Sequence, residues 1–220
     1  MKKKAGIIAA AAAGATALFF LFMLLDLHVY RDGTRRSEAA DGGLLFSVTA
    51  FDGAGESETF VPSLGHAWAA LDNRTDRPVR LNDRVLAPGE QLTVSVWAIG
   101  GHFGLYYDLE PAFIRQYGRY AGRRSIAMPI AEGQLRTIEA FLARSDRWTF
   151  FRNCSYFSVS LWNELVGEDD RLPTQWLLYT PARLRRAIDE FTRAESNMAF
   201  DRAGAPFFYL DGIGTELTLS

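Results

Sequence analysis

The sequence predicts one globular domain of mixed strands and helices that follows an apolar N-terminal segment. Its 220 residues are 48% hydrophobic and 13% aromatic, which is enough to build a full core. Short apolar runs between Gly, Pro and Asn predict strands in the first half, and apolar side chains recur at helical spacing in the second. The formal net charge of -2 provides no basic surface, so nucleic acid is not an expected partner.

The strands are expected at positions spread along the whole chain. Residues 66–71 are apolar on both sides, as in a central strand, and the chain is expected to turn at 72–76. The segment Ala87-Pro88-Gly89-Glu90 suits a type II turn, so residues 79–86 and 91–97 are expected to form a β-hairpin. The remaining strands are expected at 44–51, 102–107, 125–130 and 207–210.

Three further helices are expected besides the one described below. Pro111 can open a helix through Tyr117, and residues 131–144 place apolar side chains on one face. Thr180 is a favoured N-cap before Pro181, and the helix that follows has its inner stripe at Leu184, Ile188 and Phe191. The arginines of this helix are expected on its solvent face: Arg183, Arg185 and Arg186.

The N-terminal 30 residues predict a membrane anchor. Three lysines precede an uncharged apolar run over residues 5–25, about the length needed to cross a bilayer as a helix. A poor cleavage context after the run favours an uncleaved signal anchor over a cleaved signal peptide. We therefore expect a single-pass protein of the inner (cytoplasmic) membrane, with a linker at 31–43 and an extracytoplasmic, periplasmic domain at 44–220.

Cys154, the only cysteine, lies at an expected helix N-terminus. Asn153 is a favoured N-cap residue, and apolar side chains follow Cys154 at helical spacing up to Leu165. Main-chain N–H groups and the helix dipole lower a cysteine pKa at such a position and make the thiolate a nucleophile. The alternative is that Cys154 only packs in the core, as many free cysteines do.

A cysteine nucleophile needs a base and a polar group that orients the base. His66, at the start of a core strand, is the candidate base, although a paired core histidine would look the same in sequence. The orienting group is left open among His102, Ser95 and Asn82. One cysteine and three scattered histidines give no metal-binding pattern, and nothing in the sequence indicates a cofactor.

These residues carry a resemblance to a known superfamily. The order of Gly65-His66-Ala67-Trp68, a central hairpin and Asn153-Cys154-Ser155-Tyr156-Phe157 resembles the circularly permuted papain-like proteins. That superfamily includes NlpC-type cell-wall peptidases and enzymes similar to lecithin:retinol acyltransferase. The resemblance spans roughly residues 44–191.

The resemblance implies an α+β fold in which an antiparallel sheet packs against the cysteine helix and the helix near residues 131–144. It implies Cys154 as nucleophile, His66 as general base and His102 as a less secure third member. The implied function is a cysteine hydrolase or acyltransferase acting on an amide or ester of the cell envelope. A cell-wall peptide is the first expected substrate and a lipid-linked acyl group the second. The alternative is a non-catalytic papain-like binding module or an envelope assembly factor.

Overall fold

The computed structural model describes residues 43–53, 65–99, 101–174, 178–192, 194–210 and 213–219. The expected anchor at 1–30, its apolar run at 5–25 and, except for Gly43, the expected linker at 31–43 lie outside these residues. Within the described ranges, no helix combines the length and the apolar character needed to span a membrane.

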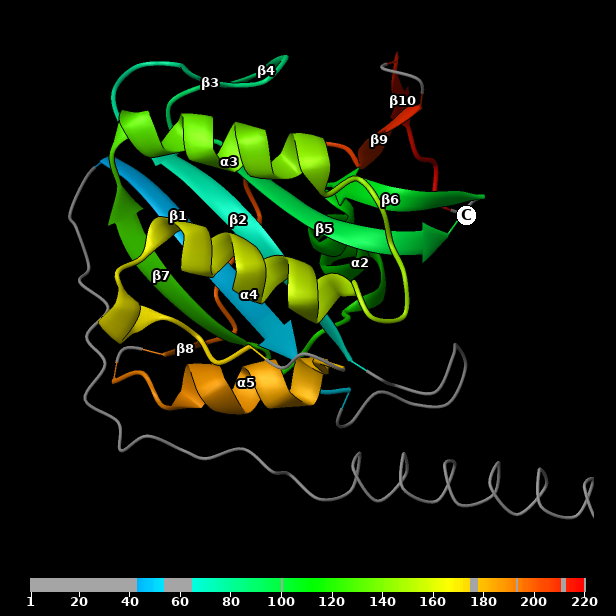
Figure 1. Ribbon diagram of the computed structural model, residues 1–220. Helices are drawn as coiled ribbons and strands as arrows, with labels where there is room; N and C mark the ends of the chain where they lie inside the picture. Colours follow the sequence, from blue (N-terminus) through cyan, green and yellow to red (C-terminus); the bar gives the residue numbers. More distant parts are fainter. Residues whose placement is uncertain are drawn as a thin grey trace, which may run out of the picture. The chain divides into compact units, whose positions relative to one another are not determined.

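The domain is α+β and is built on one large antiparallel sheet (Figure 1). Its eight strands lie in the order β10-β9-β6-β5-β2-β1-β7-β8. Their bounds are β1 Gly43–Phe51, β2 His66–Arg74, β5 Gln91–Ile99, β6 His102–Tyr107, β7 Arg124–Ile130, β8 Glu195–Ser196, β9 Phe207–Leu210 and β10 Ile213–Glu216. The central strand β2 is buried along its length up to Asn73, as its apolar sequence predicted. It continues through Asn73 and Arg74 and so passes the turn expected at residues 72–76.

Four α-helices lie in the described part of the chain, and they cover both faces of the sheet. They are α2 Leu109–Tyr117, α3 Glu132–Arg144, α4 Cys154–Leu165 and α5 Pro181–Asp189, and a 3-10 turn follows α4 at Glu168–Asp170. Buried side chains of α3, α4 and α5 share one core cluster with β1 and β2. Helix α2 lies behind the sheet in Figure 1, against β5, and packs with a separate aromatic cluster.

The expected hairpin between residues 79–86 and 91–97 is wrong. The turn at Ala87 to Glu90 is present, because the Glu90 N–H bonds the Ala87 carbonyl at 3.0 Å and Gly89 has a φ of 84°. The segment before this turn instead folds on itself as β3 (Val79–Leu81) and β4 (Arg84–Leu86). Asn82, with a φ of 51°, allows that tighter turn. Strand β5 is thereby left to pair with β2 and β6.

Two details of the expected helices also change. Arg183 lies on the inner side of α5, is only 7% exposed and donates to the Leu178 carbonyl, so it does not face solvent. Helix α2 begins at Leu109, two residues before the expected Pro111. The inner positions expected for α3 and α5 are buried, and Thr180 caps α5 as predicted by accepting the Arg183 N–H.

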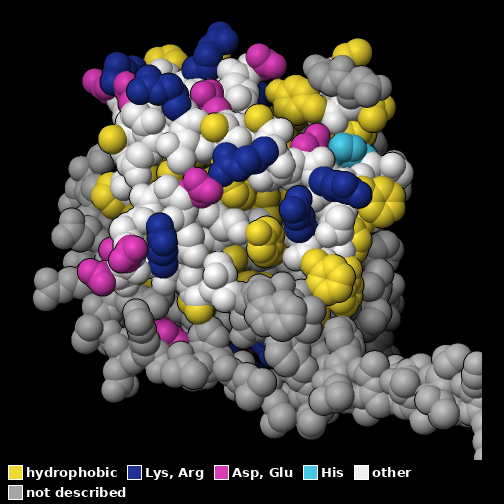
Figure 2. Space-filling model, in the orientation of Figure 1, with side chains coloured by type: hydrophobic (Ala, Val, Ile, Leu, Met, Phe, Trp, Pro, Cys, Tyr) yellow, Lys and Arg dark blue, Asp and Glu magenta, His cyan; other side chains and the backbone are white. Residues whose placement is uncertain are grey.

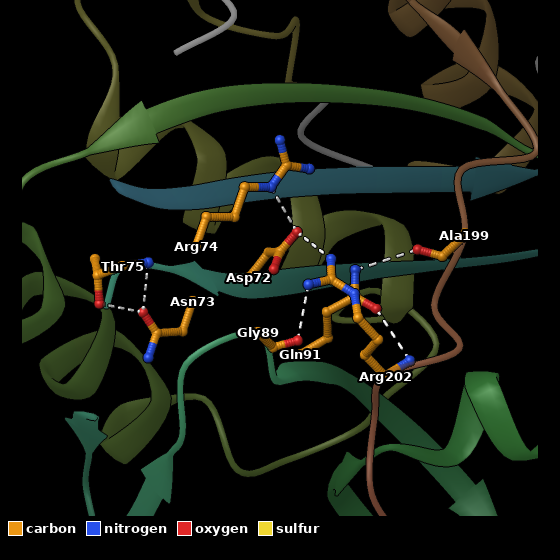
Figure 3. Close-up of polar contacts among 8 residues, drawn as sticks. All are labelled: Asp72, Asn73, Arg74, Thr75, Gly89, Gln91, Ala199 and Arg202. Atoms are coloured by element: carbon orange, nitrogen blue, oxygen red, sulfur yellow. Dashed lines mark hydrogen bonds and ion pairs between the residues drawn. The ribbon is translucent and has the colours of Figure 1, made fainter. Parts of the chain in front are cut away.

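A polar cluster ties the C-terminal segment to the ends of β2 and β5 (Figure 3). Asp72 accepts bonds from Arg74 at 2.8 Å and Arg202 at 2.7 Å. Arg202 also donates to the Gly89 carbonyl at 2.7 Å, and Gln91 donates to the Ala199 carbonyl at 3.2 Å. These bonds join residues 199–202 to the ends of β2 and β5.

Candidate functional site

Cys154 is the first residue of α4, and its position is set by the Asn153 cap. The Asn153 side-chain oxygen accepts the N–H groups of Ser155 and Tyr156, both at 3.0 Å. Its amide donates to the Tyr179 carbonyl at 2.9 Å, which ties the start of α4 to the segment before α5. The expected N-cap is therefore confirmed, and it holds a thiol that is only 8% exposed.

His66 reaches this thiol because β2 and β5 separate at one end. Their ladder stops at Ala69 opposite Val94, although β2 begins at His66 and β5 continues to Ile99. In the gap, the Ser95 hydroxyl donates to the Ala67 carbonyl at 2.6 Å. The thiol on the α4 side and the imidazole on the α2 side thus meet where the sheet is open.

Gly65 explains how the chain enters β2 at this point. Its φ is 76°, and a Cβ placed on it would lie 2.1 Å from the Phe51 carbonyl oxygen. Only glycine fits both the left-handed conformation and this close approach of β1. Gly65 therefore allows the chain to enter β2 in the direction that sets the position of His66.

Cys154, His66 and Glu110 form a connected buried triad. Cys154 and His66 are electrostatically coupled, because the charge and side-chain hydrogen bonding of each shift the pKa of the other. The His66 Nε2 lies 2.8 Å from the Glu110 Oε1, so Nδ1 is the ring nitrogen left for the thiol. Glu110 is completely buried and is the second residue of α2. A buried carboxylate against one ring nitrogen fixes the tautomer and orientation of the imidazole for the other.

Glu110 is held by two further donors. Thr93 donates to Oε2 at 2.8 Å, and the Trp97 indole N–H donates to Oε1 at 2.9 Å. Oε1 thus receives bonds from both Trp97 and His66. Three donors satisfy a carboxylate that would otherwise be costly to bury.

The residue just before α2 reinforces this arrangement. Asp108 has a φ of 55° and accepts the N–H groups of Thr93 at 2.9 Å and Gly204 at 3.2 Å. Burial raises its pKa to about 7, although these bonds and the nearby Arg84 oppose the rise. Thr93 therefore contacts both Asp108 and Glu110, and Gly204 follows the C-terminal segment held by Arg202.

Aromatic rings surround the imidazole. The Trp97 ring centroid lies 3.9 Å from that of His66, and those of Trp68 and Tyr120 lie 5.8 and 5.9 Å away. Electron-rich faces at such distances favour a positively charged imidazole. Trp97 is therefore placed to act on His66 directly, through its ring, and indirectly, through Glu110.

The electrostatics favour a thiolate and imidazolium pair. Burial alone lowers the pKa of His66, but the charge of Cys154, its hydrogen bond and the contacts with Glu110 outweigh burial and raise this pKa to about 9. Burial raises the pKa of Cys154, but the charge and hydrogen bond of His66, with the Ala67 N–H and the Ser155 hydroxyl, bring the net shift below the ordinary value. Such a pair places a nucleophile beside its proton donor.

The structure places the other expected candidates elsewhere. His102 lies at the start of β6, with Nε2 3.6 Å from the Asp146 carboxylate and its ring stacked on Phe208. Asn82 lies in the β3–β4 turn, where its N–H bonds Glu139. Ser95 donates to the Ala67 carbonyl and so borders the site.

The sequence reasoning missed Glu110, which occupies the position beside the second ring nitrogen. No local pattern marks it, because a single acidic residue at the start of a helix is ordinarily assigned to solvent. It is buried here because distant donors satisfy its carboxylate. Its partner could not be chosen from sequence, since 44 residues separate it from His66.

Comparison with models of protein families, with curated proteins and with solved structures found no match. In the described part of the chain, no group of three or more His, Cys, Asp or Glu side chains is placed to hold a metal ion. The chemical interpretation therefore depends on the geometry of Cys154, His66 and Glu110.

Proposed function

We propose that this chain is a cysteine hydrolase or acyltransferase that cleaves an amide or ester through an acyl-thiol intermediate. Cys154 is the nucleophile, His66 the general acid and base, and Glu110 the residue that orients His66. The observation that carries the proposal is that His66 lies 2.8 Å from the buried Glu110 carboxylate and is coupled to Cys154, each shifting the pKa of the other. This arrangement matches the logic of nucleophile, base and orienting acid.

The reaction has two stages. The Cys154 thiolate attacks the carbonyl carbon, and a C–S bond forms while the carbonyl oxygen takes the negative charge. The main-chain N–H of Cys154 is our candidate donor to that oxygen. Collapse of the intermediate breaks the bond to the amine or alcohol, which leaves with the proton of the His66 imidazolium. His66 then removes a proton from water or an acceptor alcohol or amine, whose attack on the thioester releases the thiolate.

The architecture supports the resemblance to permuted papain-like enzymes as part of this proposal. The strand that carries His66 precedes the helix that carries Cys154, and that helix packs against an antiparallel sheet. The order of these elements is the order that the resemblance requires. Glu110 then takes the role for which the resemblance offered His102.

The apolar run at residues 5–25 supports an envelope location for the substrate. A domain tethered outside the inner membrane meets cell-wall peptides and lipid-linked acyl groups, which supply the amides and esters this chemistry needs. We therefore propose one of these two classes as the natural substrate.

The test is direct detection of the acyl-thiol intermediate. The chain is mixed with p-nitrophenyl butyrate, nitrophenolate release is followed, and mass spectrometry locates the butyryl group. We expect a burst of about one nitrophenolate per chain and a butyryl thioester on Cys154, with neither in Cys154→Ala. Acylation elsewhere, or an equal burst in Cys154→Ala, would contradict the assignment. A folded chain with no acylation at all would favour the binding module.

A further inference from the structure

The segment at residues 199–204 runs along the start of β5 (Figure 3). The Gln91 N–H donates to the Arg202 carbonyl at 3.2 Å, and the Gln91 side-chain oxygen accepts the Arg202 N–H at 3.3 Å. The Arg202 guanidinium donates to Asp72, whose side chain is only 6% exposed. Arg202 thus joins this segment to the sheet through both its main chain and its side chain.

The other end of the segment contacts helix α2, which carries Glu110. Arg115 of this helix donates to the carbonyls of Ala203 at 3.4 Å and Gly204 at 3.2 Å. The Gly204 N–H donates at 3.2 Å to Asp108, the residue just before the helix. A Cβ on Gly204 would lie 3.3 Å from the Asp108 Oδ2, so the absence of a side chain permits this approach. The segment therefore connects the start of β5 with the start of α2.

Asp108 links this segment to Thr93. Its Oδ1 accepts the Thr93 N–H at 2.9 Å, its Oδ2 accepts the Gly204 N–H, and its own N–H donates to the Thr93 carbonyl at 3.1 Å. Asp108 is fully buried, and the Arg84 guanidinium lies 3.6 Å from Oδ2. Thr93, held by Asp108 at both its N–H and its carbonyl, donates its hydroxyl to Glu110 at 2.8 Å. The bonds thus form a continuous buried network from the segment to Glu110.

We propose that the 199–204 segment controls how firmly Glu110 contacts His66. Asp108 is the positioning residue in this control. While the segment lies on Asp108, Thr93 stays in place and its hydroxyl keeps Glu110 beside the imidazole. When the segment opens, this support is lost and Glu110 leaves His66 more often. The catalytic meaning of the contact rests on the proposed function, whereas the effect of the segment on the contact does not.

The test measures how often the contact between Glu110 and His66 opens, and it requires no catalysis. The full-length chain is labelled with nitrogen-15 histidine and held in detergent micelles. NMR then follows the His66 Nε2–H proton, which donates to Glu110 and exchanges with water when that bond opens. The signal is assigned by its absence in His66→Gln. The N–H signal of His102 in the same chain is the internal reference.

The matched variants are Arg202→Gln and Arg144→Gln. Each removes a guanidinium that donates to a carboxylate at 2.7 Å, which is Asp72 for Arg202 and Glu164 for Arg144. Arg144 and Glu164 join α3 to α4 on the face shown in Figure 2, where basic and acidic side chains are intermixed. The bonds described for the 199–204 segment reach β2, β5 and α2 instead, and α2 lies behind the sheet (Figure 1).

We expect Arg202→Gln to accelerate exchange of the His66 proton about tenfold, because the buried Asp72 loses a charged donor and the segment opens more often. Arg144→Gln should leave the rate unchanged, and Arg202→Lys should restore most of the protection. Asp108→Asn should itself accelerate exchange, because an amide offers one acceptor oxygen where the carboxylate offers two. Adding Arg202→Gln to Asp108→Asn should then change the rate little, because the link is already broken.

An unchanged rate in Arg202→Gln, or an equal acceleration in Arg144→Gln, would overturn the proposal. Fully additive effects of Arg202→Gln and Asp108→Asn would overturn the role of Asp108. Arg115→Gln removes the bonds from α2 to the segment and should also accelerate exchange, so it decides the question if Arg202→Gln does not fold. Acylation of Cys154 with no change in exchange would sink this proposal alone. The expected exchange rates without acylation would sink only the proposed function.

Discussion

His66 and His102 both contact a carboxylate and aromatic rings, yet their surroundings differ in two respects. The Glu110 carboxylate is fully buried at 2.8 Å from His66, whereas the Asp146 side chain is 43% exposed at 3.6 Å from His102. His66 also has the Cys154 thiol on its other side, whereas the ring of His102 stacks on Phe208. A fully buried acid and a thiol therefore flank the His66 ring, whereas the His102 ring has only a half-exposed acid.

The carboxylate beside His102 has a structural task of its own. Asp146 accepts the Leu105 N–H at 2.7 Å, and so ties the segment after α3 to β6. A Cβ on Gly104 would lie 2.1 Å from Asp146 and 2.7 Å from the His102 Nε2. Because Gly104 has no side chain, the side chains of Asp146 and His102 both fit over β6 at this position. His102 and Asp146 therefore provide matched controls for His66 and Glu110.

The largest effect is expected from replacing the histidines themselves. His66→Gln should slow acylation of Cys154 by p-nitrophenyl butyrate by roughly 10³-fold, because the thiol loses its base and its counter-ion. His102→Gln should change the rate by less than about twofold. A comparable loss in both variants, with both folded by circular dichroism, would break the distinction between the two sites.

A smaller effect is expected from the carboxylates. Glu110→Gln should lower the acylation rate by roughly 10²-fold, because the imidazole loses its charged partner, while Asp146→Asn should leave the rate near wild type. In Glu110→Gln, the pH at which activity is lost should also change. The pKa of His66 is raised to about 9, so the wild type keeps its general acid up to that pH.

The direction in which the His66 pKa changes in Glu110→Gln tests the role of Glu110, whatever the size of the change. Glu110 helps to raise the pKa of His66 through its charge and hydrogen bond, so Glu110→Gln should lower it. The fall in turnover should then begin below pH 9. The measurement is turnover against pH for both chains. An unchanged alkaline limb in Glu110→Gln would show that Glu110 does not act on His66.

The smallest effect is expected from Trp97. Trp97→Phe keeps an aromatic ring near His66 but removes the N–H donated to Glu110, a bond to a charged group worth about 1.5 kcal/mol. We expect about a tenfold slower acylation and a small shift of the alkaline limb to lower pH. Trp148→Phe is the control, and equal effects of the two substitutions would assign Trp97 to packing alone.

The positions of Cys154 and His66, at the starts of a helix and a strand, could be predicted because each has a local signal in the sequence. Asn153 before an apolar stripe marks the helix N-terminus that carries Cys154, and Gly65 before a buried run marks the strand that begins at His66. The pairing of the strands was harder to predict. Residues 79–86 alternate like one strand, but a tight turn at Asn82 divides them and frees β5 for the sheet.

Glu110 and Arg183 illustrate what local patterns miss. Each is a charged residue that periodicity assigns to solvent, and each is buried because distant groups supply hydrogen bonds. For Glu110, these groups come from β2 and β5, and the contact arises only where those strands separate. Such a site depends on tertiary structure and has no short-range signature.

The most direct test of the central claim is the rate at which iodoacetamide modifies Cys154 as a function of pH. A thiolate stabilised by His66 should react at lower pH than an ordinary thiol, because His66 lowers the pKa of Cys154. His66→Gln should move this reactivity to higher pH. A rate that rises only with the titration of an ordinary thiol, near pH 8.5, would contradict the ion pair and with it the proposed nucleophile.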